Sequence, residues 1–253
     1  MTSRGRAPKV KGAAALAAGA AGFAYYHAQV PTSQLYGATI CRNRDARGLI
    51  ALTYDDGPNP RCTESLLSVL ERHGARATFF LIGKWTEHEP ALAREVQAAG
   101  HAIGNHTFTH PTLALCSGDR VQEELRRCRD AVEGAGVSFS TVDGAALMRP
   151  PWGRRRPGTL RAVRSAGYGP VIWSVTGWDW RKRETAESIA ARCSKARDGD
   201  VILLHDGVHT EPSGDRTASV DATDQILRRL TAEGYRFVTV PELVAARAAA
   251  QAA

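Results

Sequence analysis

Short apolar runs alternate with amphipathic segments along most of the chain. The apolar runs lack a helical period and end at Gly, Pro or polar residues, which is typical of buried strands. The amphipathic segments carry apolar residues three and four positions apart, as helices do. We predict strands at 49–54, 77–82, 101–105, 145–148, 170–175, 201–204 and 237–240, and helices at 63–73, 90–99, 119–132, 159–166, 184–196 and 220–232.

The order of these elements predicts an α/β fold, because strands that alternate with helices form a parallel sheet with crossover helices. Seven strands are one fewer than an eight-fold barrel has, and a doubly wound open sheet is the alternative. The helix at 119–132 is expected to begin at Asp119 as its N-cap, with Gln122 three residues on, a variant of the capping box.

The N-terminal part of the chain has a different composition. Residues 1–11 carry basic residues and no acid, and residues 12–28 are uncharged and Ala-rich. This pattern is typical of a signal peptide or an uncleaved anchor, so we expect export, or membrane association through 12–28. The alternative is an N-terminal extension on a cytoplasmic protein. We predict three regions: a signal or anchor segment with linker at 1–48, one domain at 49–245 and an Ala-rich tail at 246–253.

Charge and cysteine content narrow the classes of function. The formal net charge is +7, which suits an anionic polymer or surface, but no nucleic-acid-binding motif is present and no nucleic-acid partner is expected. None of the five cysteines forms a Cys-x-x-Cys pair, which argues against a cysteine zinc site. Buried free thiols are expected, with one or two disulfides open if the protein is exported.

Ionisable residues follow the ends of several predicted strands. Asp55 and Asp56 come directly after the first strand, where Gly57 can re-aim one of the two side chains. Taken alone, this stretch is as well explained by a solvated turn. His106 and His110 follow the third strand, and two histidines with one carboxylate suit a divalent metal that keeps open positions. The carboxyl ends of barrel strands share one rim, so these groups should meet there.

Five short stretches that carry a resemblance follow one another along the chain: Thr53-Tyr54-Asp55-Asp56-Gly57, His106-Thr107-Phe108-Thr109-His110, Arg149-Pro150-Pro151-Trp152-Gly153, Asp179-Trp180 and Leu204-His205. They resemble the motifs of the NodB-type polysaccharide deacetylases, carbohydrate esterase family 4, over about Leu49 to Val240. The resemblance implies a NodB homology domain, a distorted (β/α)7 barrel, and metal-dependent removal of N-acetyl groups from amino-sugar polymers.

The resemblance implies a role for each matching residue. Asp56, His106 and His110 match the metal ligands, with zinc as the default metal and cobalt, nickel or manganese as alternatives. Asp55 matches the general base that takes a proton from the metal-activated water. Arg149 matches the residue that pairs with this base and keeps it ionised.

The remaining matches concern the leaving group and the substrate. His205 matches the general acid that protonates the leaving amine, and Asp179 the carboxylate that holds its ring. The backbone N–H of Trp152 is expected to stabilise the oxyanion together with the metal. The expected partner is an N-acetylated glycan. We expect the protein to be a monomer that is exported or membrane-anchored at the bacterial envelope. The expected substrate-binding residues are Trp152, Trp180, Pro151 and Leu204.

The chain departs from the family pattern at a few positions. Trp152 stands where Tyr is common, and Thr176 stands near the place of a further Asp. His209 matches nothing and is expected at the surface, while Trp178 either stacks on sugar or packs. Two alternatives share the fold: a deformylase of a lipid-linked amino sugar and an O-acetyl esterase. A third, of another class, is a catalytically silent carbohydrate-binding envelope protein.

Overall fold

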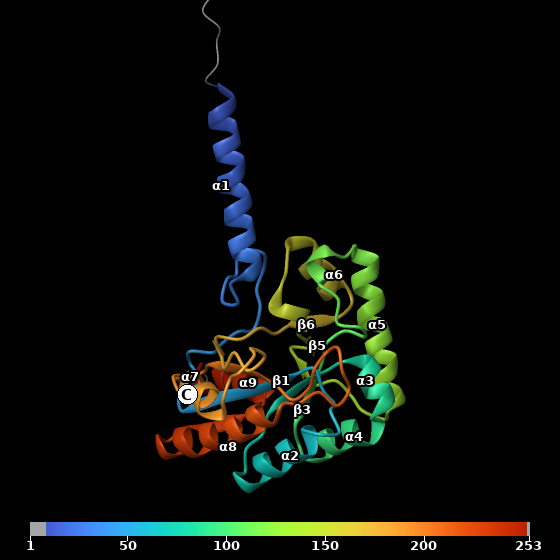
Figure 1. The fold of residues 1–253 in the computed structure, drawn as a ribbon, viewed down its shortest axis with the longest axis vertical. Helices are drawn as coiled ribbons and strands as arrows, with labels where there is room; N and C mark the ends of the chain where they lie inside the picture. Colours follow the sequence, from blue (N-terminus) through green and yellow to red (C-terminus); the bar gives the residue numbers. More distant parts are fainter. Residues whose placement is uncertain (1–8, 252–253) are drawn as a thin grey trace, which may run out of the picture.

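The computed structural model describes residues 9–251 and has a mixed sheet wrapped by helices (Figure 1). The strands are β1 (Leu49–Asp55), β2 (Thr78–Leu81), β3 (Ala102–Asn105), β4 (Thr141–Val142), β5 (Ala145–Met148), β6 (Tyr168–Pro170), β7 (Val175–Thr176), β8 (Val201–His205) and β9 (Arg236–Val238). The α-helices are α1 (Lys9–Gln29), α2 (Thr63–Arg72), α3 (Gly83–His88), α4 (Pro90–Ala98), α5 (Gly118–Gly134), α6 (Pro157–Ser165), α7 (Ala186–Cys193), α8 (Thr217–Ala232) and α9 (Val240–Gln251).

The sheet confirms the predicted α/β class. Within residues 9–251 it contains nine strands, in the order β4-β5-β3-β2-β1-β8-β7, with β6 paired to β5 and β9 paired to β1. All of these pairs are parallel except β4 with β5, which form a short antiparallel hairpin. The central strand β1 lies between β2 and β8, so the carboxyl ends of these three strands share one rim.

One predicted strand, at 170–175, is split in two. Its ends form β6 and β7, and the residues between them leave the ladder. The reason is that the guanidinium of Arg149 donates to the carbonyls of Val171 and Ile172, at 3.4 and 3.2 Å, in place of a neighbouring strand. The Ile172 N–H donates instead to Ile40, at 2.7 Å. The buried arginine thus interrupts the strand at the site.

The stretch predicted as a linker, within 30–48, packs on the sheet. Ile40 forms a parallel bridge with Val171, and Arg42 forms an antiparallel bridge with Asp200. These contacts lie beside the interval between β6 and β7, where no strand of the described chain closes the sheet. The residues before the predicted domain boundary therefore contribute to the barrel-like body.

Helix α1 projects from this body in Figure 1, with Phe23, Tyr25 and Tyr26 exposed. Of the residues that the structure describes, none belongs to a helix both long enough and apolar enough to cross a bilayer. The predicted basic stretch lies partly outside the described residues, at 1–8, as do the last two residues of the Ala-rich tail.

The start of α5 differs from the prediction. Ser117, and not Asp119, is the N-cap, and its hydroxyl accepts a hydrogen bond from the Arg120 N–H at 3.2 Å. Asp119 lies in the first turn, where a negative charge is still favoured by the helix dipole. Both residue types are good caps, so spacing alone did not separate them.

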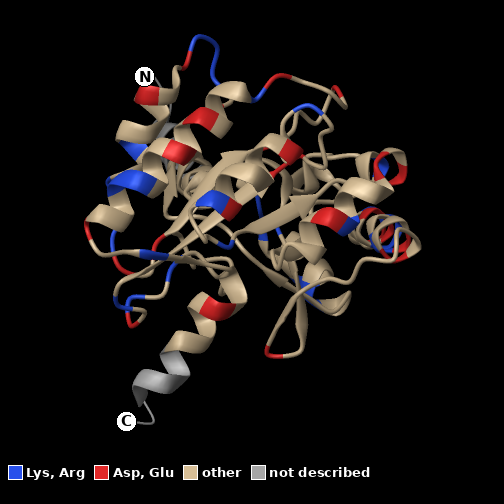
Figure 2. Cartoon of the chain, turned by 90° about the horizontal axis from the view of Figure 1, so that it is seen from below, with Lys and Arg blue, Asp and Glu red and all other residues tan. Residues whose placement is uncertain are grey.

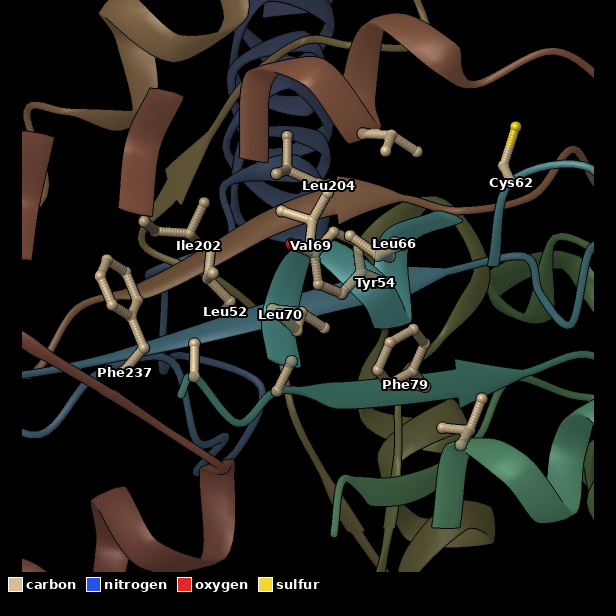
Figure 3. Packing of buried hydrophobic residues seen from close by; sticks show 14 of the residues in the cluster. Leu52, Tyr54, Cys62, Leu66, Val69, Leu70, Phe79, Ile202, Leu204 and Phe237 are labelled. Carbon is tan, nitrogen blue, oxygen red and sulfur yellow. The ribbon is translucent and has the colours of Figure 1, made fainter. Parts of the chain in front are cut away.

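The core lies on both faces of β1, whose seven residues are all buried. On one face Leu52 and Tyr54 meet Leu66 and Leu70 of α2, together with Phe79 of β2 (Figure 3). Such burial provides most of the driving force for folding, at about 25 cal/mol per Å² of apolar surface. All five cysteines are free thiols, four of them buried. In Figure 2, basic and acidic positions are interspersed over the outer helices.

A glycine holds the 30–48 stretch against the body, and this gives a test of stability. Gly199 has φ +72°, and a Cβ there would lie 1.5 Å from the Asn43 carbonyl oxygen. Gly74 has φ +57° with open space around it, so it reports backbone strain alone. We expect Gly74→Ala to cost about 1 kcal/mol and Gly199→Ala about 1–3 kcal/mol more, measured by urea unfolding. Equal losses would mean that the contact with Asn43 is unimportant.

Candidate active site

Two adjacent carboxylates emerge at the carboxyl end of β1. Asp55 keeps strand geometry, whereas Asp56 has φ 74°, in the left-handed region that favours glycine. This conformation re-aims the second side chain, as the prediction required of the turn at Gly57. Gly207 lies so close that a Cβ there would be 2.1 Å from the Asp56 carbonyl oxygen. Strained backbone held by close packing is typical of functional sites.

Asp56, His106 and His110 form a buried cluster. Asp56 Oδ1 lies 3.5 Å from His106 Nε2 and 3.3 Å from His110 Nε2, and one ligand atom from each residue lies within 4.8 Å of the others. Ligands about 2.0–2.2 Å from a tetrahedral ion are separated by similar distances. The structure therefore brings the three predicted ligands together.

Hydrogen bonding around the cluster fits a cation. The His106 Nδ1–H donates to the Arg149 carbonyl at 2.8 Å, which turns Nε2 toward Asp56. Asp56 Oδ1 is buried without a hydrogen-bond partner in the described chain. A buried carboxylate oxygen without a donor is costly unless a positive charge lies beside it. The donor set, one carboxylate and two imidazoles, is one that zinc and related ions accept.

The charge states of these groups also fit metal binding. Burial lowers the pKa of His110 to about 3, so its ring is neutral near pH 7. Burial alone would raise the pKa of Asp56, but the imidazoles of His106, His209 and His110 beside it outweigh this effect and hold the pKa well below its ordinary value. A neutral imidazole and an ionised carboxylate are the forms that coordinate metals.

Asp55 pairs with a fully buried arginine. Arg149 Nη1 donates to Asp55 Oδ1 at 2.7 Å and to Thr53 Oγ1 at 2.8 Å. The guanidinium lies over the ring of Phe80, with its central carbon 4.2 Å from the ring centroid. The second carboxylate oxygen of Asp55 lies 3.7 Å from Nε2 of His106, one of the three residues of the buried cluster. An arginine held this way fixes the carboxylate in orientation.

His205 and Asp179 form a second pair on the same rim. His205 is the register partner of Asp55 on the adjacent parallel strand β8. Asp179 Oδ1 accepts from the His205 Nδ1–H at 2.9 Å, and Asp179 Oδ2 accepts from the His205 backbone N–H and the Ser219 hydroxyl, both at 2.7 Å. Burial of the ring lowers the pKa of His205, but the Asp179 carboxylate opposes this and the net pKa is raised.

Comparison with known proteins agrees with this geometry. The family model of polysaccharide deacetylases matches residues 42–171. The chain is 37% identical over 201 residues to a peptidoglycan-N-acetylglucosamine deacetylase of Bacillus cereus, covering 78% of this chain and 88% of that protein. The chain belongs to the polysaccharide deacetylase family. This bears out the resemblance to the NodB-type enzymes of carbohydrate esterase family 4.

Two further similarities support membership of the deacetylase family. A chitooligosaccharide deacetylase of Azorhizobium caulinodans is 33% identical over 213 residues, covering 81% of this chain and 97% of that one. A crystal structure of a peptidoglycan N-acetylglucosamine deacetylase, in complex with 4-naphthalen-1-yl-N-oxidanyl-benzamide, has a TM-score of 0.71 and 32% identity. It covers 80% of this chain and 91% of that one. The distorted barrel fold of the family is thereby shown.

The candidate site opens into a cavity of about 810 Å³. Trp152, Trp178 and Trp180 line it, each more than one-third exposed. Of the expected substrate-binding residues, Leu204 lies in the core instead, and its neighbour Leu203 lines the cavity. Successive side chains of a strand point to opposite faces, so a shift of one residue reverses the assignment. Pro151, also expected there, is buried in the loop beneath Trp152 and does not line the cavity.

The expectation that His209 is a surface residue is wrong. Its ring stacks on His110 with centroids 4.4 Å apart, and its edge contacts Trp152. His209 Nδ1 lies 3.7 Å from Asp56 Oδ2, and the Lys84 ammonium donates to the His209 carbonyl at 2.8 Å. The loop after β8 folds back over the rim. The spacing of residues along the sequence did not indicate that His209 would reach the site.

Sequence reasoning also missed Glu124, which holds the loop between the two histidines. Its carboxylate lies on the buried face of α5 and accepts from the N–H groups of Phe108 and Thr109, at 3.0 and 2.8 Å. It also accepts from the Thr109 hydroxyl at 2.7 Å. A glutamate at a buried position of an amphipathic helix was the available signal, since buried carboxylates need partners.

Proposed function

We propose that this protein is a metal-dependent hydrolase that removes N-acetyl groups from the amino sugars of a polysaccharide or oligosaccharide. One observation carries the proposal: a carboxylate–imidazole set suited to a metal shares one rim with an Asp–Arg pair and a His–Asp pair. A general base, a general acid and a metal are the parts that amide hydrolysis needs. The similarity to a peptidoglycan-N-acetylglucosamine deacetylase and to a chitooligosaccharide deacetylase supports peptidoglycan-like or chitin-like chains as the substrate class.

The proposed metal-binding residues are Asp56, His106 and His110, with zinc as the proposed metal. A bound divalent ion would lower the pKa of a water molecule and polarise the acetyl carbonyl. Asp55, held in place by Arg149, would accept the proton of the attacking water.

His205 has its Nδ1 engaged by Asp179, so its Nε2 is the atom that would donate a proton to the departing amine. The raised pKa of His205 keeps the ring protonated to higher pH, as a general acid requires. Trp152 has φ 61°, and its backbone N–H is the proposed donor to the developing oxyanion. Trp152 and Trp180 would stack on sugar rings.

We further propose an envelope location for this protein. The basic and Ala-rich N-terminal sequence and the exposed aromatic residues of α1 support association with a membrane surface. The region 49–245 is proposed as the deacetylase domain, with the residues just before it packed against its sheet.

Acetate release tests the proposed activity. We expect purified protein to release acetate from chitooligosaccharides or peptidoglycan fragments, to lose at least about 95% of this activity with a chelator, and to recover it with zinc. N-formyl and O-acetyl substrates run in parallel separate the two alternative reactions on the same fold, because the deformylase would release formate. Glycan binding without release of any acyl group would contradict the proposal and favour the silent binding protein.

A further inference from the structure

The cavity at the proposed active site extends to residues that precede the family match. Gln29, Pro31 and Thr32 line the same cavity as Asp55 and His205. The family model begins only at residue 42, so this 29–32 segment has no assigned role in it. An unattached leader would not be expected to form part of the cavity that holds the proposed acid and base.

A buried arginine attaches the 29–32 segment to the body. The Arg155 side chain is fully buried, and its Nη2 donates to the carbonyls of Val30, Pro31 and Ser33 at 2.7, 2.9 and 2.8 Å. The Arg155 backbone N–H donates to the Ala28 carbonyl at 3.3 Å. Hydrogen bonds from a charged donor are among the stronger ones, at roughly 1.5–3 kcal/mol each. The segment is therefore fixed by the side chain that is best suited to hold several carbonyls.

The same arginine connects the segment to the Trp152 loop. Arg155 Nη1 donates to the Gly153 carbonyl at 3.0 Å, directly after the proposed oxyanion donor. Its neighbour Arg154 also lines the cavity, and its Nε donates to Gln29 Oε1 at 3.2 Å. One short stretch of chain thus holds the tryptophan on one side and the N-terminal segment on the other.

We propose that the 29–32 segment is part of the substrate-binding surface and contacts a sugar unit next to the one that is deacetylated. This inference rests on the proposed function. The segment offers the amide of Gln29, the hydroxyl of Thr32 and the apolar ring of Pro31, the kinds of group that bind sugar hydroxyls and ring faces. The cavity, about 810 Å³, lies in the upper part of the range for ligand pockets, about 300–1,000 Å³, which leaves room for more than the reacting sugar.

Two substrates separate this role from a structural one. An N-acetylated oligosaccharide such as chitopentaose reaches the segment, whereas 4-nitrophenyl acetate carries no sugar and does not. In the full chain, the double variant Gln29→Ala/Thr32→Ala removes the two polar side chains and leaves the backbone held. We expect KM for chitopentaose to rise about tenfold with kcat within about twofold, since two hydrogen bonds are lost. Hydrolysis of 4-nitrophenyl acetate should change by less than about twofold.

A second variant tests the attachment. Arg155→Met leaves the segment in the chain but removes the guanidinium that donates to its carbonyls. This variant should also raise KM for chitopentaose, and it should expose the segment to limited proteolysis. Arg156→Ala is the matched control, because this neighbouring arginine is exposed, does not line the cavity and donates to Cys116 instead. Thermal unfolding of all three variants shows whether each is folded.

The outcomes distinguish this proposal from the proposed function. An unchanged KM for chitopentaose in the folded Gln29→Ala/Thr32→Ala variant overturns the role of the segment, while leaving deacetylation intact. If the wild-type protein turns over no glycan, calorimetric binding of chitopentaose becomes the readout. Weaker binding by the double variant then supports the segment as a binding surface, and equal binding overturns it.

Discussion

Replacing Asp55 with asparagine is expected to lower kcat by about 10³-fold or more while the metal stays bound. Asparagine keeps the shape of the side chain but cannot accept a proton, and general base catalysis contributes about 10²–10⁴-fold. Asp55 is hydrogen-bonded to Arg149, whereas the proposed metal ligands are Asp56, His106 and His110. Removing the negative charge of Asp55 therefore leaves the proposed ligands in place. Steady-state kinetics and metal analysis after dialysis measure the two quantities on the same sample.

His110→Ala is the matched comparison for Asp55→Asn. It removes one of three proposed ligands, so bound metal and activity should fall together. His88→Ala serves as the control for histidine loss, because His88 is exposed and does not line the cavity. Equal loss of metal in Asp55→Asn and His110→Ala would contradict the division of roles between the two adjacent aspartates.

The second large effect is expected at His205. His205→Ala should lower kcat by about 10²–10⁴-fold on an amide substrate, because the leaving amine then departs without a proton. The loss should be smaller on 4-nitrophenyl acetate, whose leaving group needs no protonation. A similar loss on both substrates would mean that His205 does not act as the acid.

Asp179→Asn adds a test by pH dependence. The Asp179 carboxylate opposes the effect of burial and holds the pKa of His205 above its ordinary value. The acid form is the active one, so activity falls as pH rises through this pKa. Asparagine removes the opposing charge, so the alkaline limb of the kcat profile should move to lower pH. An alkaline limb that stays in place would argue against control of His205 by Asp179.

The candidate site residues could be placed at one rim from the sequence because they follow the ends of parallel strands. Asp55 and His205 are register partners on β1 and β8, so their places along the chain were enough to bring them to one rim. Helix and strand order was also predictable from apolar periodicity. The face of a strand was harder to predict, since Leu204 and Leu203 differ by one position but point to opposite sides.

Features that depend on long-range contacts were not predictable. His209 returns to the site through a loop, and the 29–32 segment is held by Arg155 across more than a hundred residues of chain. The split of the strand at 170–175 depends on Arg149, a side chain from another strand end. In each case a polar group from a distant part of the chain supplies the contact. The local spacing of apolar residues cannot indicate such a contact.

The proposed hydrolysis requires that Asp56, His106 and His110 together bind one divalent ion. Calorimetric titration of zinc into chelator-treated protein measures this directly, with Asp56→Ala as the comparison. We expect one tight site per chain in the wild-type protein and loss of that site in Asp56→Ala, with both proteins folded by circular dichroism. Zinc binding of equal affinity and stoichiometry in the two proteins would contradict the proposed metal site.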